Sequence, residues 1–231
     1  MKFTERPIAF TDLETTGLEE FRNSTQDLRL DYSFFCAKNE ISQTELYQIK
    51  EFSLSHPFLV AKHEICEIGL VLVSQPDLKI IKTFETKVRI NRPWAASPEA
   101  LKLNGYNAKD WENAIELPEA LKQYNSFVKG AIFAAHNVTF DWDFLKTAFL
   151  FYDIKLELDR HKLDVFTAAW MTLESKGYKP KSYRLNDIAK TIGISEEPPV
   201  HRALNGAMLA YEVYKKLQTL PTNTELPPMS G

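Results

Sequence analysis

The sharpest chemical signal in this sequence is a pair of carboxylates at the end of an apolar run near the N-terminus. Asp12 and Glu14 are separated by one leucine and close the β-prone segment 7–13. Successive residues of a strand alternate between its faces, so both carboxylates should project to one face, roughly 6–7 Å apart at their Cα atoms. Such charges repel each other unless a cation lies between them, and Mg²⁺ and Mn²⁺ prefer oxygen ligands. Two carboxylates spaced in this way, taken alone, are also common where a strand ends at the protein surface and need not bind a metal.

Two further segments strengthen the catalytic interpretation. Residues 136–145 (HNVTFDWDFL) follow the apolar segment 131–135, and residues 201–207 (HRALNGA) stand near the C-terminus. Together with Asp12-Leu-Glu14, and in this order, they resemble the three motifs of the DEDD 3′–5′ exonuclease superfamily, histidine subtype. That superfamily includes proofreading exonucleases, ribonuclease T and oligoribonuclease. The resemblance covers most of the chain, because three other segments also match: 65–69 (ICEIG), 103–106 (LNGY) and 185–189 (LNDIA).

The resemblance implies both a fold and a reaction. The fold would be α/β and RNase H-like, with a mixed five-stranded sheet and helices on both faces. The reaction would be hydrolysis of phosphodiester bonds at the 3′ end of DNA or RNA, releasing nucleoside 5′-monophosphates. Two Mg²⁺ or Mn²⁺ ions would stabilise the attacking and leaving oxygens of an in-line displacement. The implied partner is nucleic acid with a free 3′ end, preferably single-stranded, and a homodimer or a polymerase or repair partner is a further expectation.

The same resemblance assigns roles to individual residues. Asp12, Glu14 and Asp141 would be metal ligands, with Asp12 shared by both ions and Asp141 acting through water. His201 would be the general base that deprotonates the attacking water, a role that suits the near-neutral pKa of histidine. Nucleotide contacts are implied for four residues: Leu13, Thr15, Thr16 and Phe140. The sequence contains no glycine-rich phosphate-binding motif, so we expect no nucleotide-type cofactor.

One position departs from the family pattern. The third motif should read H-x-A-x-x-D, but its sixth residue here is Gly206. The missing carboxylate would be a ligand of the ion nearest the nucleophile. Asn205 points about 100° away around a helix, and Glu212 faces another side. Asp143 and Asp164 are the better candidates to supply the carboxylate, because both should leave elements at the same edge of the sheet. For Asp164, a role as a helix cap is the alternative.

This departure leaves several hypotheses open. The chain is an exonuclease that fills the gap with water or another group, or it is a catalytically impaired module of the same fold that binds nucleic-acid ends. A third hypothesis is that the chain itself is altered at Gly206. A protein-interaction scaffold that uses residues 18–62 is a fourth class, supported by that segment alone.

The elements that must position these residues follow from patterning and turn signals. Segments 64–73 and 79–90 should form an antiparallel pair of strands around the turn sequence SQPDL. Ser97 should cap a short helix that begins with Pro98. Further along the chain we expect a strand at 131–135 and helices at 118–129, from about 139, and at 164–174, 184–192 and 202–217. Strands followed by alternating helices indicate a mixed sheet packed between helices.

Length and composition limit the organisation of the chain. At 231 residues we expect one exonuclease domain over 1–219, with an insertion at about 18–62 and a flexible tail at 220–231. The insertion includes a capping-box sequence at 42–45 with apolar residues at helical spacing behind it. The formal net charge of −3 argues against binding nucleic acid through bulk charge. The segment 176–190, however, carries a net +4 and two tyrosines, which suits phosphate contacts as well as an ordinary solvated face.

The remaining composition signals concern the compartment. Cys36 and Cys66 are isolated, without metal-ligand or redox spacing, and two free thiols suit a reducing environment. No segment approaches the roughly 18 consecutive apolar residues of a membrane span. We therefore expect a cytoplasmic protein without a membrane partner.

Overall fold

The computed structural model describes residues 2–17, 63–93 and 96–223. The expected insertion at 18–62 and most of the expected tail lie outside these residues. The described chain forms one five-stranded sheet in the order β3-β2-β1-β4-β5. The strands are β1 (Ile8–Thr15), β2 (Ile65–Val73), β3 (Ile80–Lys87), β4 (Ile132–Ala135) and β5 (Lys162–Asp164). β1, β2 and β3 are antiparallel neighbours, whereas β4 runs parallel to β1 and β5 parallel to β4. The predicted mixed sheet is confirmed.

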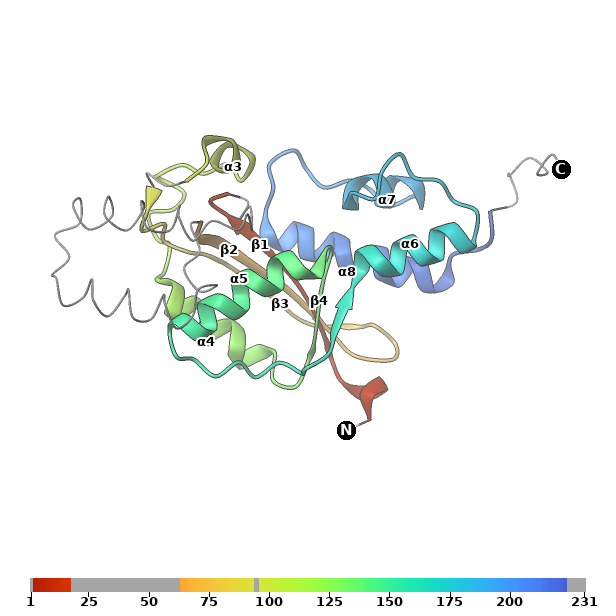
Figure 1. Cartoon of the computed structure of the whole chain (residues 1–231), viewed down its shortest axis with the longest axis horizontal. Helices are drawn as coiled ribbons and strands as arrows, with labels where there is room; N and C mark the ends of the chain where they lie inside the picture. Colours follow the sequence, from red (N-terminus) through yellow and green to blue (C-terminus); the bar gives the residue numbers. More distant parts are fainter. Residues whose placement is uncertain (1, 18–62, 94–95, 224–231) are drawn as a thin grey trace, which may run out of the picture.

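Helices cover both faces of this sheet. They are α3 (Pro98–Leu103), α4 (Leu117–Phe127), α5 (Val138–Phe151), α6 (Val165–Ser175), α7 (Leu185–Thr191) and α8 (Ala203–Thr219), preceded by a short 3-10 helix, η1 (Phe3–Glu5). The apolar residues of α4 and α5 pack in one core cluster and those of α6, α7 and α8 in another. Figure 1 shows the long helix α8 running beside β1, with α7 beyond it and α3 near the end of β1.

The alternation of side chains along β1 explains how the strand serves both cores. Ile8 and Phe10 pack in the cluster that contains α8, whereas Ala9 and Leu13 pack in the cluster that contains α4 and α5. Asp12 continues the row of Ile8 and Phe10, because side chains two residues apart share a face. The acidic end of β1 is therefore directed toward α8, the helix that carries the third motif.

A glycine in β2 permits α8 to approach the sheet closely. A Cβ atom added at Gly69 would lie 2.1 Å from the backbone carbon of Ala203, the first residue of α8. No side chain fits there, so this position of the ICEIG segment requires glycine. The contact fixes the beginning of α8, and with it His201, next to β1 and β2.

The LNGY segment at the end of α3 contacts both the first motif, at the end of β1, and the third motif, which begins with His201. The backbone N–H of His201 donates to the carbonyl of Leu103 at 3.1 Å. The buried side chain of Asn104 donates to the carbonyl of Thr15 at 3.0 Å, at the end of β1. These two bonds connect the strand that carries the acids to the segment that carries the histidine.

The described part of the chain also bears on two compositional expectations. None of its helices is both long and apolar enough to cross a bilayer. Cys66 is a free, buried thiol in β2, and Cys36 lies outside the described residues.

Candidate active site

The end of β1 brings Asp12 and Glu14 into a region largely removed from water. Glu14 is only 8% exposed, and Asp12 is partly exposed. Burial, reinforced by the charges of Glu197 and Glu67, raises the pKa of Asp12 to about 7. Burial, followed by the charges of Asp12, Glu197 and Glu67, raises the pKa of Glu14 to about 9, against a lowering effect of Arg202. The shifts follow first from burial and second from the mutual repulsion of these acids.

Asp141 adds a third carboxylate from the opposite side of the sheet. It lies in the first turn of α5 and is 3% exposed. Its Oδ1 atom accepts a hydrogen bond from the backbone N–H of Leu13 at 2.9 Å. Burial, and then the charge of Asp12, raises its pKa well above the usual range, although the hydrogen bond from Leu13 opposes the shift. Asp141 is thus fixed beside the strand that carries Asp12 and Glu14.

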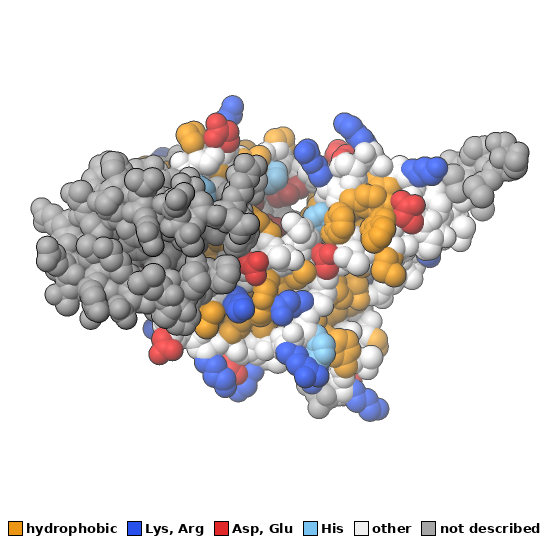
Figure 2. Space-filling view, viewed as in Figure 1, with side chains coloured by type: hydrophobic (Ala, Val, Ile, Leu, Met, Phe, Trp, Pro, Cys, Tyr) orange, Lys and Arg blue, Asp and Glu red, His pale blue; other side chains and the backbone are white. Residues whose placement is uncertain are grey.

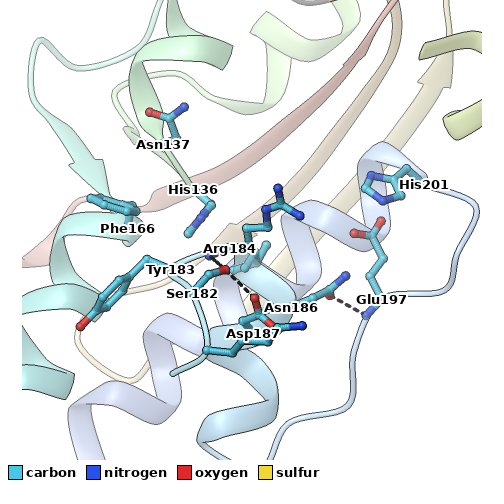
Figure 3. Close-up of a pocket in the computed structure, with 12 residues that line it drawn as sticks. His136, Asn137, Phe166, Ser182, Tyr183, Arg184, Asn186, Asp187, Glu197 and His201 are labelled. Atoms are coloured by element: carbon cyan, nitrogen blue, oxygen red, sulfur yellow. Dashed lines mark hydrogen bonds between the residues drawn. The ribbon is translucent and has the colours of Figure 1, made fainter. Parts of the chain in front are cut away.

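His201 joins Glu14 and a residue that the sequence did not predict, Glu197. One ligand atom from each of these three side chains lies within 4.8 Å of the other two. Figure 3 shows the Glu197 carboxylate directed toward the His201 ring. Asp12 and Asp141 are not members of this compact group in the described residues. The structure therefore brings two of the four predicted catalytic residues together with one unpredicted acid and places the other two beside them.

Gly206 accounts for the position of Asp12. A Cβ atom added at Gly206 would lie 2.6 Å from Oδ2 of Asp12 and 2.7 Å from its Cγ. The Asp12 carboxylate thus occupies the space into which a side chain at 206 would project. The family pattern expects a carboxylate at this position, and the geometry agrees that a residue here would meet Asp12 directly.

The expectation that Asp143 or Asp164 replaces the missing carboxylate is not supported. Asp164 is the N-cap of α6, and its Oδ2 accepts from the backbone N–H of Thr167 at 3.2 Å. Its Oδ1 accepts from the backbone N–H of Val138 at 3.1 Å. These bonds confirm the predicted capping role and lower the pKa of Asp164 despite its partial burial. Asp143 acts electrostatically on Lys162 in β5 and is absent from the compact group.

An ion pair behind the site holds the start of α8. Nη1 of Arg202 lies 3.5 Å from Oε2 of Glu67, a residue with no exposed surface. The Arg202 guanidinium also lies 5.3 Å from the ring centre of Trp111. Oε1 of Glu67 has no hydrogen-bond partner among the described residues. Because Arg202 directly follows His201, these contacts restrict where the histidine can point.

The four predicted nucleotide contacts lie at the end of β1 and the start of α5, where most of their polar groups are already engaged. The hydroxyl of Thr15 donates to the carbonyl of Gly17 at 2.9 Å, and that of Thr16 accepts from the backbone N–H of Glu64 at 2.8 Å. Leu13 is buried, and Phe140 packs against Phe144 with ring centres 5.1 Å apart. Their role toward a nucleotide stays a prediction.

A cleft of about 880 Å³ leads away from the acidic site. Its lining runs from Glu197 and His201 along residues 181–187 to Phe166 and His136. Figure 3 shows Arg184 between the two histidines, and Figure 2 shows Lys and Arg side chains around α7 beside the hollow that contains the acidic and His side chains. The predicted basic segment thus contributes Lys181 and Arg184 to the cleft, whereas Lys176 donates to the carbonyl of Leu220.

The donor set fits a hard divalent cation. Asp12, Glu14, Asp141 and Glu197 offer carboxylate oxygens, which Mg²⁺ and Mn²⁺ prefer, and His201 lies beside them. Glu14 is only 8% exposed, and its side chain has no hydrogen-bond partner within the described ranges. Burial and mutual repulsion raise the pKa values of these acids, and a bound cation would offset both effects.

Comparison with known proteins identifies the family. The exonuclease family model named for RNase T matches residues 9–214, nearly the whole chain. The chain belongs to this exonuclease family. The resemblance to DEDD 3′–5′ exonucleases and the RNase H-like fold are thereby confirmed.

Curated relatives are much longer proteins. The chain is 30% identical over 155 residues to a PolC-type DNA polymerase III of Caldanaerobacter subterraneus. The aligned region covers 67% of this chain and 10% of that protein. It is 29% identical over 170 residues to the 3′–5′ exonuclease DinG of Staphylococcus aureus, covering 70% of this chain and 17% of that protein. The chain therefore spans less than a fifth of the length of these relatives.

Solved structures share the fold at low sequence identity. The nuclease domain of 3′hExo, a DEDDh family member bound to rAMP, has a TM-score of 0.60 at 15% identity and covers 95% of this chain and 96% of that one. Exonuclease I of E. coli with a dT13 oligonucleotide has a TM-score of 0.63 at 14% identity and covers 94% of this chain and 41% of that one.

Proposed function

We propose that this chain is a metal-dependent 3′–5′ exonuclease that releases nucleoside 5′-monophosphates. The observation that carries the proposal is the convergence of Asp12, Glu14 and Asp141 with His201 at one end of the sheet, in a chain of the exonuclease family. The domain would extend over residues 1–219, with an insertion at about 18–62. Two divalent ions, Mg²⁺ or Mn²⁺, are the proposed cofactors.

Each side chain has a definite task in this proposal. When bound, the ions would supply the charge that stabilises the attacking and leaving oxygens. Asp12 and Glu14 would bind ions directly, and Asp141, held by the N–H of Leu13, would bind through water. His201 would accept the proton of the attacking water, since its ring lies at the acidic site and opens onto the cleft.

The substrate is proposed to be a single strand with a free 3′ end. Two solved structures with this fold are described as bound to rAMP and to a dT13 oligonucleotide. In this chain Lys181 and Arg184 line the cleft that leads from His201, so they could hold successive phosphates without reading base sequence. A preference for DNA or RNA would depend on contacts to the 2′-hydroxyl. We propose no preference between the two. The relatives include a DNA polymerase, so a polymerase or repair partner, or a second copy of the chain, is part of the proposal.

An end-binding module with impaired catalysis is the second candidate function. The observation in its favour is Gly206, which offers no ligand atom and leaves the Asp12 carboxylate turned into its space. In that case the cleft would bind a 3′ end, but the acidic site would not hold both ions in working order.

The polarity and the product of the reaction test the main proposal. Single-stranded DNA and RNA oligonucleotides carrying a 5′ label should shorten one nucleotide at a time with Mg²⁺ or Mn²⁺, and nucleoside 5′-monophosphates should appear by chromatography. An oligonucleotide with a blocked 3′ end is the matched control and should resist cleavage. Stable oligonucleotides that nevertheless bind the chain would support the end-binding function instead.

A further inference from the structure

The compact group around Glu14 suggests how this chain makes up for Gly206. The family's third motif carries an aspartate at this position, and here the space beside Gly206 holds the carboxylate of Asp12 instead. The metal site is therefore one negative charge short of the family pattern. A replacement must bring a carboxylate to Glu14 from some other part of the chain.

Glu197 is placed to do so. It is half-buried in the segment 192–202 that joins α7 to α8, and one of its carboxylate oxygens lies within 4.8 Å of ligand atoms of both Glu14 and His201. These distances leave room for one ion between the oxygens, because Mg²⁺ ligands lie about 2.0–2.1 Å from the metal. Glu197 is the only acid outside the predicted set in this group, within the part of the chain that is described.

Glu197 is held by two hydrogen bonds, one from its backbone and one to its side chain. Its N–H donates to Oδ1 of Asn186 in α7 at 2.9 Å, as Figure 3 shows. Its Oε1 accepts from the backbone N–H of Arg202, at the start of α8, at 3.4 Å. A side chain fixed by the elements on both sides of its segment loses little freedom when it binds an ion.

The electrostatic environment also favours a cation here. Glu197 faces Glu14, which is buried and lacks a hydrogen-bond donor among the described residues, and it adds to the negative potential at Asp12. Placing a fourth acid beside such groups is unfavourable unless a cation binds between them. His201 offsets part of this charge at Glu197 when it is protonated.

We propose that Glu197 replaces the missing aspartate as a carboxylate ligand of the divalent ion held by Asp12 and Glu14. The inference rests on the proposed exonuclease function for the identity of the site, but it concerns metal binding and is tested without turnover. The alternative role for Glu197 is to position the His201 ring, which would leave the metal affinity unchanged.

The test is a Mn²⁺ titration of the full chain, followed by the electron paramagnetic resonance signal of free Mn²⁺. Glu197→Gln keeps the shape and removes the charge, so the affinity should fall by at least about 10-fold, the smaller loss seen when even outer-shell partners are removed. Glu196→Gln is the matched control: its neighbouring carboxylate is about half exposed and lies 3.9 Å from Lys190, so the affinity should not change. Circular dichroism would verify that each variant is folded.

Restoring the family aspartate gives a second arm. In the double variant Glu197→Gln with Gly206→Asp, the Mn²⁺ affinity should recover to at least that of the unchanged chain. An affinity in Glu197→Gln equal to that of the unchanged chain would overturn the inference. So would Mn²⁺ binding that survives in Asp12→Asn, or an unchanged chain that does not bind Mn²⁺. An unchanged affinity with a shifted pH profile of cleavage would assign Glu197 to positioning His201. A chain that binds Mn²⁺ through Glu197 but does not cleave would refute the proposed function and leave this inference standing.

Discussion

Gly206 of α8 faces the carboxylate of Asp12 so closely that a Cβ atom at Gly206 would lie 2.6 Å from Oδ2. The strand that carries the first acidic motif and the helix that carries the third therefore meet at a position where one of them has no side chain. The Asp12 carboxylate is the end of a flexible side chain, so a larger residue at 206 would displace it. This relationship makes Gly206 the most informative position to change.

Replacing Gly206 by aspartate should strengthen metal binding and cleavage. The new carboxylate would act as a ligand, so we expect a gain in rate of about 10-fold or more at low Mg²⁺. Without metal the same variant should lose roughly 1–3 kcal/mol of unfolding free energy, because it adds a buried like charge. Initial rates over a Mg²⁺ series and thermal unfolding in EDTA measure the two effects.

Gly206→Ala is the matched control for that change. It adds the Cβ atom and the helix propensity of alanine but no ligand. A rate gain in Gly206→Ala as large as in Gly206→Asp would show that the gain comes from moving Asp12 and not from the added carboxylate.

The stability of the metal-free chain should fall as the pH rises. The folded pKa values of Asp12 and Glu14, about 7 and about 9, lie above the unfolded values of about 4. Between these limits the folded state binds more protons than the unfolded state, so the free energy of unfolding decreases with increasing pH. The melting temperature in EDTA should therefore decline from pH 5 to pH 9, and Mg²⁺ should stabilise the chain more at pH 8 than at pH 6.

Asp12→Asn provides the check on this assignment. The amide does not titrate, so the decline through pH 7 should flatten and the response to Mg²⁺ should shrink. A decline with the same slope in Asp12→Asn would place its origin in other groups.

Lys181 and Arg184 should hold phosphates of the substrate strand. Both are exposed and line the cleft that begins at His201. Replacing either by alanine should weaken oligonucleotide binding and reduce the dependence of log K on log salt by about 0.7 for each phosphate that is no longer neutralised. Fluorescence anisotropy at several salt concentrations gives both quantities. Lys190→Ala is the control, since Lys190 lies near Glu196 outside the cleft lining, and a comparable weakening there would point to a general charge effect.

His201→Ala should reduce the rate without reducing end binding. Removal of a general base costs roughly 10²–10⁴-fold in rate, whereas the cleft residues that hold the strand stay in place. Single-turnover rates and anisotropy on the same oligonucleotide separate the two quantities. Equal losses of binding and rate would show that His201 holds the substrate instead of activating water.

Much of the fold follows from local patterns in the sequence. The alternation along β1 predicted that Asp12 and Glu14 share a face, and Ser97 caps α3 by accepting from the backbone N–H of Ala100 at 3.3 Å, as expected. β5 was not located, because three residues are too few to show a period, and their segment reads as the start of α6. The fifth strand of the sheet was expected only from the family resemblance.

The candidate site was predictable only where the family motifs are intact. Asp141 and His201 lie in the segments that match the family motifs. Glu197 lies in a connection without helix or strand that contains two prolines, and no sequence motif marks it. An acid four residues before the motif histidine, in a chain that lacks the motif's own aspartate, is the clue that could have revealed it. For Asp164 the sequence allowed both a metal ligand and a helix cap, because an acid at a strand end suits either role, and the structure confirms the cap.

We expect this chain to cleave nucleic acid with the acids of β1. The decisive measurement is the initial rate of nucleotide release from a 5′-labelled single strand in saturating Mn²⁺, made side by side for the unchanged chain and for Asp12→Ala. We predict clear turnover by the unchanged chain and its loss in Asp12→Ala. Equal non-zero rates would show that Asp12 is not needed for cleavage. Turnover that is absent in the unchanged chain and appears only in Gly206→Asp would rule out the exonuclease function and favour end binding.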